Sequence, residues 1–230
     1  AISAKYAKER KAFGKSIADF GMIQHKLGEM AIRIYASESM GYRAVGMIDA
    51  LLEGHSWKEA DYAQTMLKAV EAFAAACSSI KVFASEALDY VTHGGYGFHQ
   101  DYAVEHSYRD SRINRIFEGT NEINRMLATG WLLKKAQKGQ LGLVEAVKKL
   151  MGEVMSGPGA GQADGDENSR LVTNAKKIGL LALGVAYQKY LTALEEQQEV
   201  LAGITDILMA AFAMESVYLR TEKNPSDQKR

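Results

Sequence analysis

Two long stretches of this chain carry apolar residues at alternating spacings of four and three, which is the period of one buried helix face. The first covers residues 22–52 and opens with Ile23, Leu27 and Met30, and the second covers residues 57–91. Only 2 prolines occur in the sequence, and both lie outside these stretches. Each helix would be about 45 Å long at ~1.5 Å per residue. The pattern therefore predicts an all-α fold built on an up-down bundle of the four-helix type.

The sequence divides near residue 138 into this bundle and a helical extension. We expect further helices in the bundle, residues 1–138, at 1–11, 103–111 and 120–138. The extension, residues 139–230, is predicted to hold helices at 141–154, 170–195 and 199–221. The segment from 156 to 169 is rich in Gly, Asp and Asn and predicts a flexible loop between them.

Local signals mark several helix ends. Gly14 is expected to stop the first helix. Ser56, with Glu59 three residues later, predicts a capping box at the start of the 57–91 helix. Thr120 is a good N-cap for the next helix, and Glu122 lies in its first turn, where the helix dipole favours an acid.

Composition excludes several classes of function. The formal net charge is zero, so there is no bulk electrostatic case for binding nucleic acid. A single cysteine, Cys77, excludes an internal disulfide framework. The histidines lack the spacing of a metal site, so no metal is predicted. No signal peptide is visible, and because the first residues already have the pattern of a helix interior, the chain is expected to be part of a longer one.

Glu118 is the first candidate for chemistry, because it stands just ahead of the helix start at Thr120. Backbone N–H groups at such a start can bind a ligand. With Ile116 and Phe117 beside it, the carboxylate could lie in an apolar pocket, where it would become a stronger base. On these residues alone, an acid that merely stabilises the helix dipole is the favoured interpretation.

Two glycine-containing segments are candidates for binding phosphates. Arg10, Phe13 and Gly14 together could hold a phosphate and a flat ring, although an arginine satisfying its own helix end is the simpler interpretation. The turn at residues 94–97 has three glycines in four positions and could cradle a pyrophosphate. A plain connection between helices explains that turn equally well, and no strand precedes it as a dinucleotide-binding loop would require.

Three segments in order resemble the C-terminal helical domain of the acyl-CoA dehydrogenases. They are YAKERKAFG at residues 6–14, HGGYG at 93–97 and RDSRINRIFEGTNEI at 109–123. The resemblance is close over residues 1–138 and weaker beyond them. It implies that the chain is the C-terminal part of a flavoenzyme that oxidises an acyl-CoA to a trans-2-enoyl-CoA in fatty acid β-oxidation.

In that family the residue matching Glu118 takes the α-proton of the thioester, while the β-hydrogen leaves as hydride to FAD. The resemblance implies that Gly119 touches the substrate. It also implies a set of FAD-contacting residues, namely Thr120 and Glu122 near the flavin and Arg10, Phe13, Gly14, Phe20, Gly94 and Gly95 at the ADP end. Because part of that set serves the flavin of a neighbouring subunit, a homodimer or a dimer of dimers is implied, with an electron-transferring flavoprotein as the redox partner.

Two positions depart from the pattern of many members, which carry glutamine there. Gly21 is instead similar to the very-long-chain branch, whereas Val91 departs from that branch as well. The extension after residue 138 also resembles that branch and implies a membrane-associating segment, for which residues 141–154 are the candidate; packing in a core is the alternative. The implied location is the cytoplasm in a bacterium or the mitochondrion in a eukaryote, with possible peripheral contact at the inner membrane.

Two other functions stay open on the sequence. An acyl-CoA oxidase of the same superfamily would use oxygen as its electron acceptor. A non-catalytic assembly or membrane-docking domain would keep the scaffold without the chemistry. Since the family's N-terminal helical domain and flavin-covering β-domain are not among these 230 residues, the chain alone is expected to retain little flavin.

Overall fold

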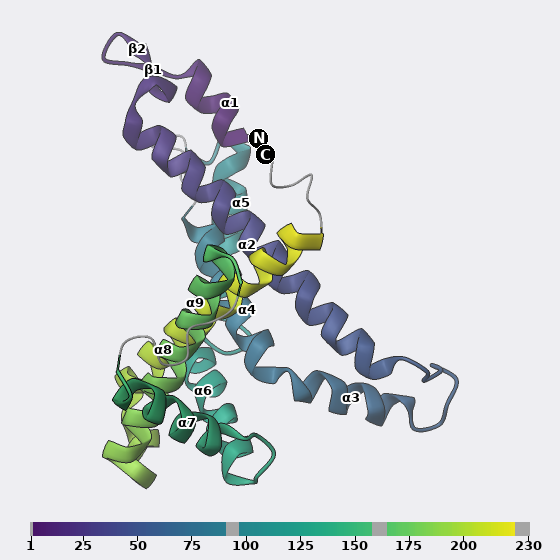
Figure 1. Cartoon of the computed structure of the whole chain (residues 1–230). Coiled ribbons are helices and arrows are strands. Elements are labelled where there is room, and N and C mark those ends of the chain that lie inside the picture. The colour runs from purple at the N-terminus through teal and green to yellow at the C-terminus, as the bar shows by residue number, and fades with distance from the viewer. Residues whose placement is uncertain (1, 91–96, 158–164, 224–230) are drawn as a thin grey trace.

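The computed structural model describes residues 2–90, 97–157 and 165–223 (Figure 1). Helices make up most of it and the only strands described are β1 and β2, so the predicted all-α fold class is confirmed. The helices and strands are, in order, α1 (Ile2–Glu9), β1 (Lys11–Ala12), β2 (Lys15–Ser16), η1 (Ile17–Asp19), α2 (Gly21–Leu52), α3 (Tyr62–Ala72), α4 (Ala74–Asp89), α5 (Ala103–Arg112), η3 (Ile113–Arg115), α6 (Asn121–Gln137), α7 (Leu143–Met155), α8 (Glu167–Tyr190), η4 (Leu191–Glu196) and α9 (Gln198–Lys223).

The central core is formed by α2, α4, α6 and α9, which pack against one another (Figure 1). Met40 of α2 and Val82 of α4 are fully buried, and they meet Met209 and Ala213 of α9. A second cluster joins Leu133 of α6 to residues of α8 and α9. The last helix therefore shares its core with helices of the first 138 residues.

The apolar character of α9 follows from this position. It is the one helix in the described ranges that is long and apolar enough to cross a membrane by length and composition, with a mean hydropathy of 1.7. Its buried side chains, among them Leu201, Ile204 and Met209, pack against α2, α6 and α8. A helix at the centre of a protein core needs the same composition as a membrane span.

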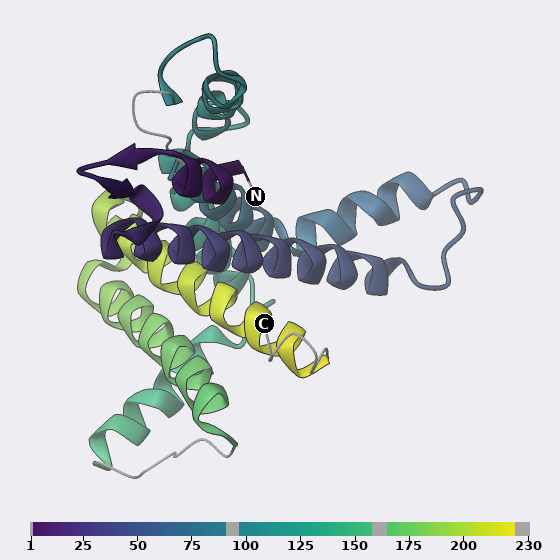
Figure 2. The same cartoon turned by 90° about the horizontal axis from the view of Figure 1, so that it is seen from above.

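The predicted single helix over residues 57–91 is wrong in two respects. Residues 56–61 form turns, in which the Glu59 carboxylate accepts the Ser56 N–H at 2.9 Å, so the capping interaction exists but the helix begins only at Tyr62. At Phe73, with φ −110° and ψ 20°, the helix breaks into α3 and α4. The break lets α3 leave the core, and together with the second half of α2 it projects as an arm (Figures 1 and 2).

The prediction that Gly14 stops the first helix is also wrong. Helix α1 ends at Glu9, and β1 pairs with β2 in a short antiparallel hairpin. Phe13 and Gly14 form its two-residue turn with φ of 52° and 82°. Positive φ at both positions is what the twist of a tight hairpin requires.

The extension starts its second helix earlier than the sequence predicts. Helix α8 begins at Glu167 rather than at residue 170, because the Asp166 side chain caps it by accepting the Ser169 N–H at 2.8 Å. Seven residues of the predicted loop, 158–164, lie outside the described ranges. The amphipathic helix α7 buries Val147 and Leu150, and it packs against α8.

Candidate active site

The turn that leads into α6 places Glu118 ahead of the helix start. Glu118 and Gly119 have φ of 55° and 79°, both in the left-handed region. Thr120 then caps the helix by accepting the Ile123 N–H on its hydroxyl oxygen at 3.3 Å. The predicted N-cap is thereby confirmed, and Glu122 lies in the first turn as expected.

Two side chains hold this turn by its carbonyl oxygens. Asn124 is buried, and its amide Nδ2 lies 3.3, 2.8 and 3.1 Å from the carbonyl oxygens of Glu118, Gly119 and Thr120. The Lys81 ammonium of α4 donates to the Gly119 carbonyl at 2.7 Å. A left-handed glutamate costs about 1–3 kcal/mol and persists only where its surroundings fix it. These hydrogen bonds are what fixes Glu118.

Asn121 anchors the same end of α6 to α4. Its side chain is 1% exposed. Its Oδ1 accepts from Lys81 at 2.8 Å, and its Nδ2 donates to the Ser85 hydroxyl at 3.0 Å. Burial lowers the pKa of Lys81, while the nearby carboxylates of Glu122 and Glu86 oppose that shift. The base of the turn is therefore a connected polar network rather than a set of single contacts.

Arg125 extends the network from α6 to α9. Its guanidinium binds both carboxylate oxygens of Glu86 in α4, at 2.8 and 3.0 Å, and Asp206 in α9 at 2.7 Å. Burial works to raise the pKa of Glu86, but hydrogen bonds from Arg125 and Asn121 outweigh it and hold that pKa below its usual range. The Thr205 hydroxyl, also in α9, donates to the Arg125 carbonyl at 2.6 Å.

A hollow of about 260 Å³ opens beside Glu118, lined by Lys81, Ala84, Ser85, Leu88, Asn114, Phe117 and Glu118. Glu118 itself is exposed at its edge. Ile116 and Phe117 are 52% and 48% exposed. The expected apolar pocket around the carboxylate is therefore not formed by the residues described here.

The predicted ADP-binding residues lie at the hairpin. Phe13 is 95% exposed at its tip. Its ring meets Phe20 edge-on, with centroids 6.2 Å apart, and the Lys15 ammonium lies 4.3 Å from the centre of the Phe20 ring. Arg10 follows the end of α1, directly before β1, and is exposed. The exposed Phe13 ring beside cations suits a flat ring that carries phosphates, so these residues fit one part of a dinucleotide.

The structure keeps the two halves of the predicted site apart. Figure 1 shows the hairpin at the outer end of α2, away from α6, so Arg10, Phe13, Gly14 and Phe20 are not brought to Glu118. Thr120 and Glu122 do adjoin it. Hydrogen bonds from its own N–H and from the Thr120 hydroxyl hold the pKa of Glu122 below its usual range. Gly94 and Gly95 lie outside the described residues.

Sequence reasoning missed the residues that support the turn. The sequence did not indicate Lys81, Asn121 or Asn124. A possible signal was the spacing of Asn121 and Asn124, which places both on one face of the first turn after Thr120. In the portions of the chain that the structure describes, no three potential metal ligands gather.

Fold and site together define a helical domain that presents a carboxylate at the start of a core helix. The chain belongs to the acyl-CoA dehydrogenase family: a model described as "Acyl-CoA dehydrogenase, C-terminal domain" matches residues 2–133. A second model with the same description matches residues 174–230.

Similar proteins support this assignment over nearly the whole chain. A probable acyl-CoA dehydrogenase of Bacillus subtilis is 45% identical over 232 residues, which cover 96% of this chain and 39% of that protein. The CarC subunit of the caffeyl-CoA reductase–Etf complex of Acetobacterium woodii is 38% identical, over 57% of this chain and 31% of its own. The crystal structure of an acyl-CoA dehydrogenase complexed with FAD from Bacillus anthracis superposes with a TM-score of 0.87 at 47% identity, over 96% of this chain and 39% of that one. This chain thus spans less than half the length of these relatives.

Proposed function

We propose that this chain is the C-terminal part of a flavin-dependent acyl-CoA dehydrogenase. In the whole protein, Glu118 would remove the α-proton of an acyl-CoA thioester on the way to a trans-2-enoyl-CoA. The observation that carries the proposal is the fixed left-handed turn, which presents the Glu118 carboxylate beside a hollow at the start of α6. Family membership and the FAD complex of the similar structure support it.

The chain's own groups would act on the thioester in two ways. The Glu118 carboxylate would take the α-proton from the carbon next to the thioester carbonyl. The Glu118 backbone N–H makes no hydrogen bond within the described ranges, so it is free to donate to the thioester oxygen, where negative charge develops. Gly119 leaves room for the thioester because it has no side chain. Bound FAD would supply the hydride acceptor for the β-hydrogen.

The hairpin would hold the ADP end of FAD through Arg10, Phe13, Gly14 and Phe20. Because the hairpin lies away from Glu118, this FAD would belong to the active site of a second subunit, which favours a homodimer or a dimer of dimers. Thr120 and Glu122 would contact the flavin of the subunit's own site. An electron-transferring flavoprotein is the proposed redox partner, and fatty acid β-oxidation the proposed role.

The reverse reaction is a second candidate. One relative of 38% identity is named as a subunit of a reductase complex. Reduction of an enoyl-CoA would use the same carboxyl group to give its proton to the α-carbon, while bound reduced FAD would supply the hydride for the β-carbon. The direction of the reaction would then be set by the redox partner rather than by the Glu118 turn.

Anaerobic reduction of the flavin by acyl-CoA in the full-length protein tests the proposal. We expect an acyl-CoA to reduce the flavin of the wild type. Glu118→Gln should slow this reduction about 10²–10⁴-fold, the usual contribution of a general base, with flavin still bound. Glu53→Gln, which replaces an exposed acid at the end of α2, is the matched control. Reduction at the wild-type rate in Glu118→Gln would show that another group removes the proton, whereas no reduction of the wild-type flavin would favour the assembly-domain alternative.

A further inference from the structure

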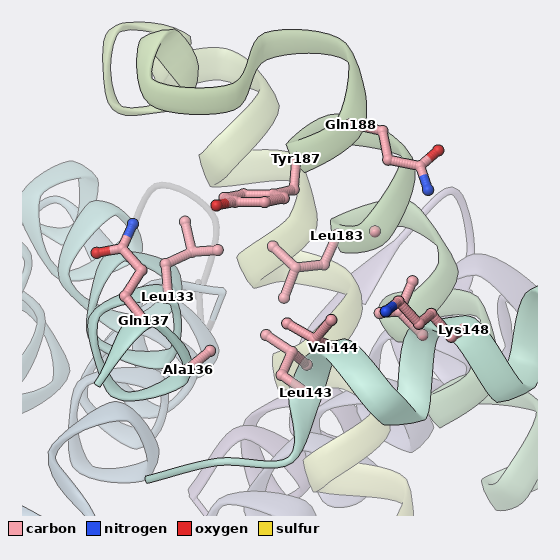
Figure 3. A pocket seen from close by; sticks show the side chains of 11 residues that line it. Leu133, Ala136, Gln137, Leu143, Val144, Lys148, Leu183, Tyr187 and Gln188 are labelled. Atoms are coloured by element: carbon pink, nitrogen blue, oxygen red, sulfur yellow. The ribbon is translucent and has the colours of Figure 1, made fainter. Parts of the chain in front are cut away.

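A second cavity lies at the other end of α6, where that helix meets α7 and α8 (Figure 3). Its volume is about 250 Å³. An apolar protein cavity of only ~150 Å³ already accommodates benzene. Helix α6 has 17 residues, so its two ends are about 25 Å apart. The cavity therefore does not belong to the Glu118 turn.

The inner wall of the cavity is aliphatic. Leu133 and Leu183 are buried, and they face Leu143 and Val144 of α7 across the cavity (Figure 3). At Gly184, α8 comes so close to α7 that a Cβ would stand 2.4 Å from a methyl carbon of Val147. The cavity thus ends on a closely packed helix pair. Its interior suits a hydrocarbon chain rather than a polar ligand.

The rim of the cavity is polar and carries a single charge. Among the described residues that line it, Lys148 is the only ionisable side chain apart from the Tyr187 phenol, and none is an acid. Within the described ranges, Lys148, Gln137 and the Tyr187 hydroxyl make no hydrogen bond or ion pair through their side chains. Figure 3 shows Tyr187 and Gln137 on one side of the opening and Lys148 on another. Three donors without partners surround an aliphatic interior.

We propose that this cavity binds an aliphatic monocarboxylate of medium length, with its chain between α6, α7 and α8 and its carboxylate at Lys148. The apolar walls select the chain, and the unpaired ammonium selects the charge, because an anionic head would neutralise the one charge on the rim. Gln137 and Tyr187 donate to the same head. This site does not depend on the function proposed for Glu118, since no residue is shared between them.

Calorimetric titration of the purified chain with octanoate tests the site. We expect saturable one-to-one binding. Hexanoate should bind more weakly by about fourfold for each methylene removed, as burial of hydrocarbon predicts. Butyrate should show no saturation. Binding that ignores chain length, or no saturable binding of octanoate, would overturn the proposal.

Substitutions separate the charge from the cavity. Lys148→Gln should weaken octanoate binding at least about fivefold, whereas Lys149→Gln, its exposed neighbour outside the cavity, should leave it within about twofold. Octan-1-ol should bind the wild type less tightly than octanoate does and should not respond to Lys148→Gln. If the two lysine substitutions weakened octanoate binding equally, the binding would depend on general surface charge rather than on Lys148. That result would contradict the proposal.

Filling the cavity provides a readout that does not involve charge. Val144 lines the cavity and is 48% exposed, so Val144→Phe should narrow the cavity without unfolding α7. Octanoate binding should then be lost while thermal unfolding stays cooperative. If Val144→Phe instead dissociates a dimer seen by gel filtration, and octanoate does not bind the wild type, a second copy of the chain occupies the cavity and the fatty-acid site is wrong.

Discussion

At the scale of single residues, Glu118 owes its place to its neighbours rather than to its own preference. Its positive φ is uncommon for a residue with a side chain. The buried Asn124 amide and the Lys81 ammonium compensate by binding the carbonyl oxygens of the turn. A general base must be held in position to be effective, and in the described part of the chain the turn is held without a hydrogen bond or ion pair to the Glu118 carboxylate.

Gly119→Ala tests how tightly the turn is held. Gly119 has a φ of 79°, and a Cβ there would stand 3.0 Å from the Asn124 amide nitrogen. The substitution should cost about 1–2 kcal/mol for the left-handed conformation, measured by urea unfolding. Gly130→Ala in α6, the helix that follows the turn, is the control, because nothing lies within 4 Å of its Cβ position. Gly130→Ala should stabilise the chain by about 0.5–1 kcal/mol. An equal loss of unfolding free energy in both variants would contradict this account of the turn.

Sequence reasoning at this scale succeeded where the signal was local. Thr120 and Glu122 follow from helix-start chemistry within four residues, and the structure has both where expected. Lys81 escaped prediction because its partner, the Gly119 carbonyl, is 38 residues away in sequence. The hairpin at Phe13 and Gly14 was missed because a glycine after a helix also fits a helix stop.

At the scale of elements, one arginine links α6 to both α4 and α9. Arg125 joins Glu86 and Asp206, and Thr205 binds its carbonyl oxygen. The periodic apolar pattern predicted the existence of α2 and α9, and the helix-start signal at Thr120 predicted α6. The pattern did not show that α9 packs among the earlier helices, because the period identifies a buried face but not what covers it. The apolar pattern also did not predict the break at Phe73, because the alternating spacing of four and three continues through that residue.

The interaction of the Glu86 carboxylate with Arg125 makes the free energy of unfolding depend on pH. Because the pKa of Glu86 is lowered from its usual value of 4.5 in the folded state, its contribution is complete above that value and is lost as the pH falls through the folded-state pKa. At neutral pH, Glu86→Gln should therefore cost about 1–3 kcal/mol. The difference from the wild type should shrink as the pH falls below 4.5.

Urea unfolding of both proteins across this pH range measures the effect. Glu9→Gln is the control, because it removes only the exposed Lys5 pair at 3.9 Å, and its cost should stay below about 1 kcal/mol. A Glu86→Gln difference that grows as the solution becomes more acidic would have the wrong sign and would contradict the lowered pKa.

At the scale of the whole molecule, the chain presents two separate parts of a proposed flavin site. The hairpin with the exposed Phe13 lies at one end of α2, and the Glu118 turn lies beside α4 (Figure 1). Apolar side chains such as Phe117 and Ile116 are exposed around the turn. The Bacillus subtilis protein and the Bacillus anthracis structure match nearly the whole of this chain, and each of them is more than twice as long as it.

We therefore expect the 230-residue chain on its own to retain little flavin. The exposed rings and carboxylate form neither an enclosed site nor a continuous one in the part that the structure describes, and a half-exposed cofactor gains little from binding. The visible absorbance of the purified chain after incubation with FAD and gel filtration measures this. A stoichiometric yellow protein would contradict the expectation.

The central claim is that Glu118 is the base that acts on the carbon next to the thioester. The most direct measurement is the rate at which solvent deuterium enters that carbon of an acyl-CoA bound to the full-length protein, followed by mass spectrometry. Glu118→Gln should lower this rate about 10²–10⁴-fold, and Glu53→Gln should leave it unchanged. Deuterium entering at the wild-type rate in Glu118→Gln would show that another group removes the proton.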